Sequence, residues 1–306
     1  MTASPATDTA PAPLESRGGT DLLLLLMAVI WGVNFSVLKF GTRFVSPLAF
    51  NGTRIALAAA SQVGLATLLR LPTVERRAAR RLVVLGMLGN GVYQVLFILG
   101  VVRSSVATAA LIVASTPAFI AILGRLMGVE ALQRRQWGGI ALQVLGCASV
   151  VLGSGRAVAG ADTPLGAALL LLASSSWALY SVVLRRDALP VHPLQVGGYT
   201  MLGGALVSTV VAIPAIAATD WTALALPVYA ALFYGAIIAM VIAYLFWYRG
   251  LRVLGPTRTA LYSNLQPLIA AAVAYVTLRE VPTGLQAFGG ACVVSGLLLA
   301  RRPGAT

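Results

Sequence analysis

The sequence LLLLLMAVIWGVNFSVLKF occupies residues 22–40 and consists almost entirely of apolar residues. A helix that crosses a bilayer needs roughly 20 such residues, because the hydrocarbon core is about 30 Å thick and each helical residue rises about 1.5 Å. A second stretch, ALLLLASSSWALYSVVLRR at residues 168–186, has a similar pattern, in which Trp177 matches Trp31 and Arg185 matches Lys39. The two stretches predict a membrane protein built from two similar halves.

The composition of the whole chain supports a membrane environment. Of the 306 residues, 58% are hydrophobic and 10% are charged, and the mean hydropathy is +0.88. Soluble domains have roughly 45–50% apolar and 25% charged residues. The net charge of +13 does not indicate nucleic-acid binding, because the charges lie in short gaps between apolar segments and form no basic face.

Ten apolar segments account for nearly all of the chain. They are predicted at residues 22–40, 48–69, 82–102, 106–127, 137–153, 165–184, 194–217, 224–247, 257–278 and 284–300. Residues 1–20 are rich in Ala, Pro and Thr and are expected to form a disordered tail. No polar run is long enough for a separate soluble domain.

The second half of the chain repeats the first. A shift of 146 residues aligns Trp31 with Trp177, and a shift of 150 aligns Pro117 with Pro267 and Glu130 with Glu280. The predicted repeats are residues 21–155 and 163–302. Because each repeat has an odd number of spans, the second enters the membrane from the opposite side. The predicted fold class is an all-α membrane protein of ten transmembrane helices, arranged as two inverted five-helix repeats, which places a binding site near the midplane where the repeats meet.

The cationic residues predict the orientation of the chain. Most of the 22 Lys and Arg residues lie in the N-terminal tail, the even-numbered connections and the C-terminal end, whereas Lys39, Arg43, Arg103, Arg156 and Arg279 fall on the other side. Cationic loops stay on the cytoplasmic side. Both termini are therefore predicted to be cytoplasmic, in a bacterial-type inner membrane.

These motifs resemble a known family. The sequence Trp31-Gly32-x-Asn34-Phe35, Arg54 in the second span, and the spacing Pro117 to Glu130, repeated at Pro267 to Glu280, are similar to those of the EamA-type drug/metabolite transporters. The resemblance covers residues of about 20 to 302. It implies a ten-helix fold around a central cavity and the export of amino acids, purines or other metabolites.

Ionisable side chains deep in a membrane are costly, so they are candidates for function. Arg54 is the only one well inside a predicted span, where its guanidinium is suited to a carboxylate or a phosphate. An anchoring role, in which Arg54 snorkels or binds backbone carbonyls, is the alternative. None of the nine Asp and Glu residues lies in the middle of a span, which favours facilitated transport or exchange over proton antiport through a carboxylate.

The other candidates for substrate binding are uncharged polar and aromatic residues at mid-depth. They are Trp31, Asn34, Asn90, Tyr93, Gln94, Trp177, Tyr180, Tyr199, Tyr244, Tyr262, Asn264 and Gln266. The alternative for each is a role in joining helices. Pro117 and Pro267 are expected to kink their helices and act as hinges, and Glu130 and Glu280 to stabilise helix ends.

The sequence predicts a transporter of small metabolites, with amino acids or related zwitterions as the preferred substrates. Purines, nucleobases and drugs remain open, and an integral membrane enzyme is the alternative of another class. The only histidine, His192, lies beside Pro193 in a connection, so no His-based metal or catalytic site is expected. We expect no cofactor, and either a monomer or a homodimer.

Overall fold

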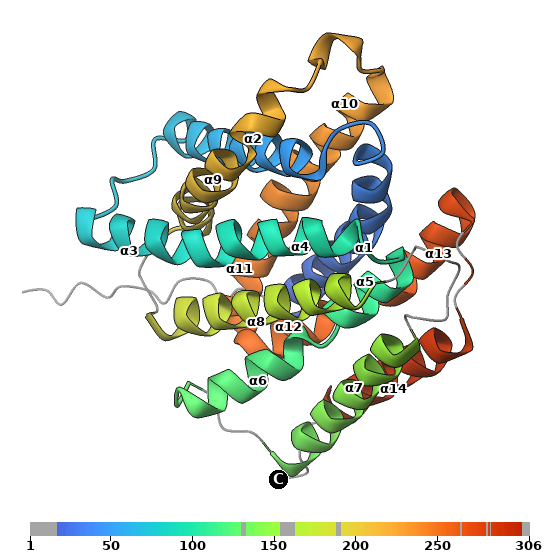
Figure 1. Cartoon of the computed structure of the whole chain (residues 1–306). Coiled ribbons are helices and arrows are strands. Elements are labelled where there is room, and N and C mark those ends of the chain that lie inside the picture. The colour runs from blue at the N-terminus through green and yellow to red at the C-terminus, as the bar shows by residue number, and fades with distance from the viewer. Residues whose placement is uncertain are drawn as a thin grey trace, which may run out of the picture.

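The computed structural model describes residues 17–129, 133–153, 163–187, 191–263, 265–279, 281 and 283–301, and in these residues the regular structure is helical (Figure 1). The first repeat contains α1 (Arg17–Gly41), α2 (Pro47–Leu68), the composite helix of α3 (Arg76–Gly86), η1 (Met87–Val92) and α4 (Tyr93–Val101), the interrupted helix of α5 (Val106–Val113) and α6 (Thr116–Leu126), and α7 (Arg134–Gly153).

The second repeat has the same order of elements. It contains α8 (Pro164–Asp187), α9 (Pro193–Ala217), a short 3₁₀ turn η2 (Trp221–Ala223), the composite helix of α10 (Leu226–Phe233), η3 (Tyr234–Ile242) and α11 (Ala243–Leu254), the interrupted helix of α12 (Pro256–Ser263) and α13 (Gln266–Leu278), and α14 (Gly284–Arg301). The ten predicted spans are therefore confirmed as helical segments. The first helix begins at Arg17, inside the segment that was expected to be disordered.

Within the residues that the structure describes, six single or composite helices are long and apolar enough to cross a membrane. They cover Gly18–Gly41, Arg76–Val101, Val106–Leu126, Pro164–Asp187, Pro193–Ala217 and Leu226–Leu254. Helix α2 is less apolar because it carries Asn51, Arg54 and Gln62, and all three side chains are buried in the protein. Polar groups in a spanning helix are tolerated when protein shields them from lipid.

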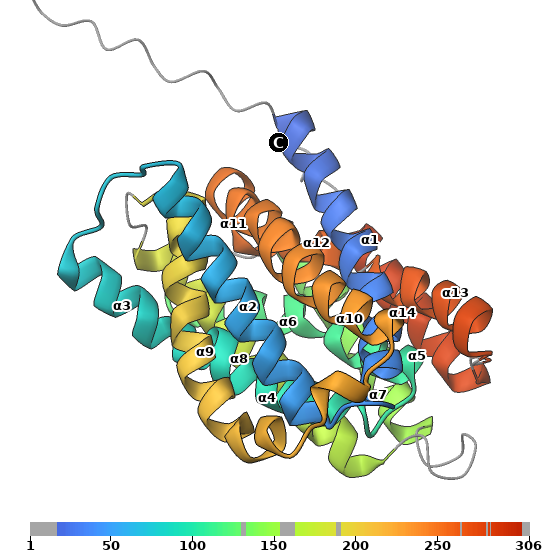
Figure 2. The same cartoon turned by 90° about the horizontal axis from the view of Figure 1, so that it is seen from above.

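The two repeats interlock instead of lying side by side. Helix α2 packs along α9 and α7 packs along α14, so the corresponding helices of the two repeats meet each other. Helix α1 contacts α11 and α13 of the second repeat, and α8 makes the equivalent contacts with α4 and α6 of the first. Figure 1 shows the α7–α14 pair, and Figure 2 shows α10 and α11 lying between α2 and α1. The first helix of each repeat is thus held in the other repeat.

Both composite helices contain a π-helical segment at the corresponding position. In a π segment the backbone hydrogen bonds run to the fifth residue instead of the fourth, which changes the carbonyls that side chains of neighbouring helices can reach. In η3, the indole of Trp31 donates to the carbonyl of Ala239 at 2.9 Å and the amide of Gln62 to that of Met240 at 2.8 Å. In η1, the hydroxyl of Ser208 donates to the carbonyl of Gly91 at 3.5 Å. Polar side chains of α1, α2 and α9 therefore hold these segments from across the repeat interface.

The two interrupted helices break just before a proline. In the first repeat α5 ends at Val113 and α6 begins at Thr116, so that Pro117 occupies the first turn of α6. The hydroxyls of Ser115 and Thr116 donate to the carbonyls of Ile112 and Val113, at 2.7 and 2.6 Å, which satisfies backbone groups that the break leaves open. Pro267 occupies the first turn of α13 in the same way. Glu130 and Glu280 lie outside the described residues.

Close helix contacts depend on glycine at two places where α3 and η1 cross α9. A Cβ atom at Gly86 would overlap the backbone of Thr200, and one at Gly203 would overlap the backbone of Val83. Without side chains at these positions, the two backbones approach closely, as is common in membrane helix packing.

We predict that Gly86→Ala destabilises the protein by about 1–3 kcal/mol, because the added methyl forces the two backbones apart. The measurement is the thermal unfolding midpoint of the purified protein in detergent. Gly64→Ala is the matched control, since a Cβ at that position of α2 meets nothing within 4 Å. Equal unfolding midpoints for the two variants would contradict the packing described for α3 and α9.

Candidate functional site

An aromatic cluster forms where side chains from the first helices of the two repeats meet. Trp31 of α1 and Trp177 of α8, which correspond in the two repeats, lie edge to face with ring centroids 6.2 Å apart. Tyr244 of α11 lies against both, at 5.6 Å from Trp31 and 5.3 Å from Trp177. Edge-to-face pairs at these distances are favourable. The interlocked fold therefore brings two indoles and a phenol from three helices together.

The cluster extends to each side. The ring of Trp247 lies 5.7 Å from Trp31 and 5.5 Å from Trp177, and that of Tyr93 lies 4.9 Å from Trp177. Tyr93 also stacks on Phe97 at 5.5 Å. These rings form apolar walls that are rich in π-electron density, a surface that attracts both apolar groups and cations.

Arg54 reaches the same region from α2. Its side chain is 1% exposed, and its aliphatic part passes over Gly235 of η3, where a Cβ atom would meet the Cδ of Arg54 at 2.6 Å. One terminal nitrogen of the guanidinium donates to the side-chain oxygens of Asn51 and Gln94, both at 2.7 Å. These bonds fix the direction of the guanidinium.

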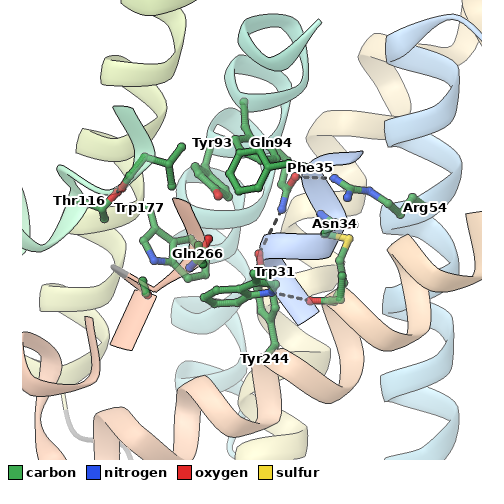
Figure 3. Close-up of a pocket in the computed structure, with 15 residues that line it drawn as sticks. Trp31, Asn34, Phe35, Arg54, Tyr93, Gln94, Thr116, Trp177, Tyr244 and Gln266 are labelled. Carbon is green, nitrogen blue, oxygen red and sulfur yellow. Dashed lines mark hydrogen bonds between the residues drawn. The ribbon is translucent and has the colours of Figure 1, made fainter. Parts of the chain in front are cut away.

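Gln94 connects the cation to the aromatic cluster. Its amide nitrogen donates to the hydroxyl of Tyr244 at 3.1 Å (Figure 3). Its backbone carbonyl accepts from the side-chain amide of Asn51 at 3.3 Å. Gln94 and Tyr244 correspond in the two repeats. The network Asn51–Arg54–Gln94–Tyr244 thus crosses the interface between them.

The charge of Arg54 has no anionic partner in the part of the chain that the structure describes. Its neighbours there are neutral, and its Nε atom makes no hydrogen bond with any described residue. The buried Oδ1 atom of Asn34 is likewise without a partner among these residues. A buried charge without a counter-ion is costly, so such a group is suited to bind an anion that the protein does not itself supply.

A cavity of about 50 Å³ lies between these groups. It is lined by Trp31, Asn34, Phe35, Arg54, Tyr93, Gln94, Phe97, Val113, Thr116, Trp177, Ala239, Met240, Tyr244, Ser263 and Gln266 (Figure 3). This volume holds a few water molecules, whereas pockets for small organic ligands measure about 300–1,000 Å³. The cavity is therefore too small for a metabolite, which can enter only when the walls move apart.

Of the candidates from the sequence, the structure brings eight to the cavity wall. They are Trp31, Asn34, Arg54, Tyr93, Gln94, Trp177, Tyr244 and Gln266. Two others, Asn90 and Tyr180, are fully buried and do not line it. Tyr199 lies in a lateral groove between α2 and α9, Tyr262 lies near the start of α1, and Asn264 is outside the described residues.

Sequence reasoning missed several residues of the site. Asn51 lies three residues before Arg54, and this spacing places both on one face of a helix, so it was detectable. Thr116 and Ser263 line the cavity at the two helix breaks. Such small polar residues are not distinctive in the sequence, so they could not be recognised as site residues from it.

Tyr180 belongs to a second polar cluster in the other half. Its hydroxyl lies 2.9 Å from that of Tyr248, which in turn lies 3.1 Å from the hydroxyl of Thr200. The shift of 146 residues that aligns the two repeats pairs Thr200 of the second repeat with Arg54 of the first. One repeat thus contributes a cation and the other contributes hydroxyl groups, so the centre of the molecule is chemically asymmetric.

Hydrogen bonds join the helices at both ends of the central region. At the start of α1, Asp21 accepts from the hydroxyl of Tyr262 at 2.6 Å and pairs with Arg258 at 3.4 Å. At the opposite end, the amide of Gln286 donates to the hydroxyl of Thr108 at 2.7 Å. The backbone amide of Thr163 donates to the carbonyl of Arg103 at 3.0 Å. These contacts hold the helices together at both ends of the central region, in keeping with the small volume of the cavity between them.

Comparison with known proteins agrees with this arrangement. The chain is 27% identical to an uncharacterized transporter, YyaM, of Bacillus subtilis, over 91% of this chain and 92% of that protein. It is 31% identical to an uncharacterized inner membrane transporter, YedA, of Escherichia coli K12, over 81% and 79%. A probable amino-acid metabolite efflux pump of the same strain is 27% identical, over 91% and 93%.

A solved crystal structure of a protein with 21% sequence identity has a similar fold, with a TM-score of 0.69 over 94% of this chain and 97% of that one. The model of the EamA-like transporter family matches residues 19–152 and 164–302 of this chain. The two matches correspond to the two interlocked repeats, one after the other. The chain is thus a multi-pass membrane transporter and belongs to the EamA-like transporter family.

Proposed function

We propose that the protein exports or exchanges amino acids or related small zwitterions, which it binds between its two repeats. The observation that carries the proposal is the buried guanidinium of Arg54, which lines a small aromatic cavity and has no carboxylate partner among the described residues. A substrate carboxylate would supply the missing negative charge. Its arrival would make the burial of Arg54 less costly, which links binding to charge compensation.

The remaining groups of the cavity suit the other parts of a zwitterion. The Oδ1 atom of Asn34, which has no partner among the described residues, is an acceptor for an ammonium group. The ring faces of Trp31 and Trp177 attract cations and apolar side chains. The cavity therefore combines one anion receptor with cation-binding and apolar surfaces. An amino acid needs all three.

Alternating access provides the movement that a cavity of about 50 Å³ requires. The helix breaks before Pro117 and Pro267 lie beside the cavity, and Thr116 and Gln266 at these breaks line it. A broken helix bends at less cost than a continuous one because hydrogen bonds are already absent there. We assign these breaks as the hinges about which one half rocks against the other.

Energy coupling through a membrane carboxylate is not part of the proposal. The described acidic residues lie at or near helix ends or in connections: Asp21 near the start of α1, Glu75 before α3, Asp187 at the end of α8 and Asp220 before η2. We therefore propose facilitated transport or exchange. The name of the Escherichia coli relative as a probable amino-acid metabolite efflux pump supports the substrate class.

A purine or another flat heterocycle is the competing substrate. The aromatic walls would stack on it, but it would leave Arg54 without an anion. Counterflow of labelled nucleobases that does not depend on Arg54 would favour this alternative.

We predict that Arg54→Met lowers the apparent affinity for the transported amino acid about 10- to 100-fold, since a hydrogen bond to a charged group contributes about 1.5–3 kcal/mol. Arg54→Lys keeps the charge but loses the planar donor group, so its affinity should lie between that of the unchanged protein and that of Arg54→Met. The measurement is counterflow of labelled amino acids in liposomes.

Arg125→Ala is the control for these variants, because Arg125 is exposed in the last turn of α6 and does not line the cavity. It is expected to transport as the unchanged protein does. Normal counterflow by a folded Arg54→Met variant would overturn the proposed role of Arg54.

We also propose that both termini face the cytoplasm of a cell with an inner membrane. Green fluorescent protein fused after Thr306 is expected to fluoresce, and alkaline phosphatase fused there to be inactive, because the phosphatase matures only outside the cytoplasm. A phosphatase fusion in the connection between α7 and α8 is the opposite control and should be active. Active phosphatase at the C-terminus would contradict the predicted orientation.

A further inference from the structure

A lateral groove lies where the end of α2 meets the start of α9, two helices that run side by side in Figure 2. Its volume is about 300 Å³. It is lined by Val63, Ala66, Thr67, Arg70, Leu71, Pro72, Thr73, Gln195, Gly198, Tyr199 and Leu202. It shares no lining residue with the central cavity, so it is a separate site.

The groove has an apolar wall and a polar end. Val63 is 37% and Leu202 36% exposed on the outside of the helix pair, in segments that cross the membrane. Towards the helix ends the lining changes to Arg70, Thr73 and Gln195. This order, from apolar to cationic along the direction of the helices, matches a phospholipid in one leaflet, with its acyl chain beside the helices and its headgroup at their ends.

The backbone holds Arg70 at the mouth of the groove. The amide of Arg70 donates to the carbonyl of Thr67 at 3.0 Å and that of Leu71 to the carbonyl of Ala66 at 3.1 Å, which is the hydrogen-bond pattern of a Schellman motif. Arg70 itself has a φ of 49°, in the left-handed region where this motif usually has glycine. An arginine thus occupies a position at which glycine would be more favourable for the backbone.

The guanidinium of Arg70 has no binding partner among the described residues. It makes no hydrogen bond or ion pair with any residue that the structure describes. Gln195 joins two lining segments of the groove by donating from its side-chain amide to the carbonyl of Pro72 at 2.5 Å. Arg76, Arg77, Arg80 and Arg81 follow in the next segment and add to the positive charge of this end.

We propose that this groove binds one anionic phospholipid of the surrounding leaflet. The phosphate pairs with Arg70, and an acyl chain lies along Val63 and Leu202. Basic pockets between membrane helices attract anionic headgroups, and each cation near the surface contributes to this selectivity. The lipid would fasten the α2–α9 pair at one end of the interface between the repeats.

The test is native mass spectrometry of the full chain with phosphatidylglycerol and phosphatidylcholine at equal concentration. We expect the unchanged protein to retain phosphatidylglycerol selectively. Arg70→Gly should reduce this retention about fivefold. Because glycine suits the left-handed backbone, this variant should unfold at the same or a higher temperature, which separates lipid binding from a structural role.

Arg279→Gly is the matched control. Arg279 ends α13 with a φ of 58°, so the same substitution relieves the same backbone conformation away from the groove. It should retain phosphatidylglycerol as the unchanged protein does. Equal lipid retention by Arg70→Gly and Arg279→Gly would overturn the proposal.

A second pair of variants tests the apolar part of the groove. Gly198→Leu adds a side chain at the groove wall, where a Cβ would meet Val63 at 3.5 Å, whereas Gly64→Leu adds the same side chain where nothing lies within 4 Å. Only Gly198→Leu should lose the bound lipid. Glycerol phosphate, which has a headgroup but no chain, should not compete at equal concentration. Competition by glycerol phosphate, or lipid retention by Gly198→Leu, would show that the site does not bind a phospholipid as proposed.

Discussion

The guanidinium of Arg54 is enclosed by protein within a spanning helix, and neutral Asn51 and Gln94 hold it in place. In such surroundings a cation is stabilised far less than in water, and two amide oxygens replace only part of its hydration. The neighbouring structure accommodates it: Gly235 leaves room for its side chain, and Gln94 links it to Tyr244. The proposed substrate class follows from this one incompletely compensated charge, and the need for movement follows from the small volume of the cavity beside it.

Interlocked repeats explain how such a site arises. Because α1 packs in the second repeat and α8 in the first, Trp31 and Trp177 meet at the centre, and the polar network crosses from one repeat to the other. A site made in this way changes whenever the repeats move. The two repeats are chemically different at this position, because the first has Arg54 where the second has Thr200.

Much of the fold was predictable, because apolar length and the repeated Trp and Pro residues are properties of the sequence alone. The site was predictable in part: Arg54 is conspicuous at mid-span, and Trp31 and Trp177 share a position in the repeats. Tyr199 and Tyr262 show the limit, since depth along a helix does not reveal which face a side chain occupies, and they lie in a lateral groove and beside Asp21. The π segments were not predicted, because they depend on partners such as Gln62 from a distant helix.

The central claim is that the cavity recognises a carboxylate. Three of the five tryptophans, Trp31, Trp177 and Trp247, belong to the aromatic cluster, so their fluorescence reports on binding there. The most direct measurement is a fluorescence titration of the purified protein with an amino acid and with its carboxamide, which differ only at the group that would face Arg54. The account predicts a saturable change with the acid and at least tenfold weaker binding of the amide. Equal affinity for the two compounds would contradict it.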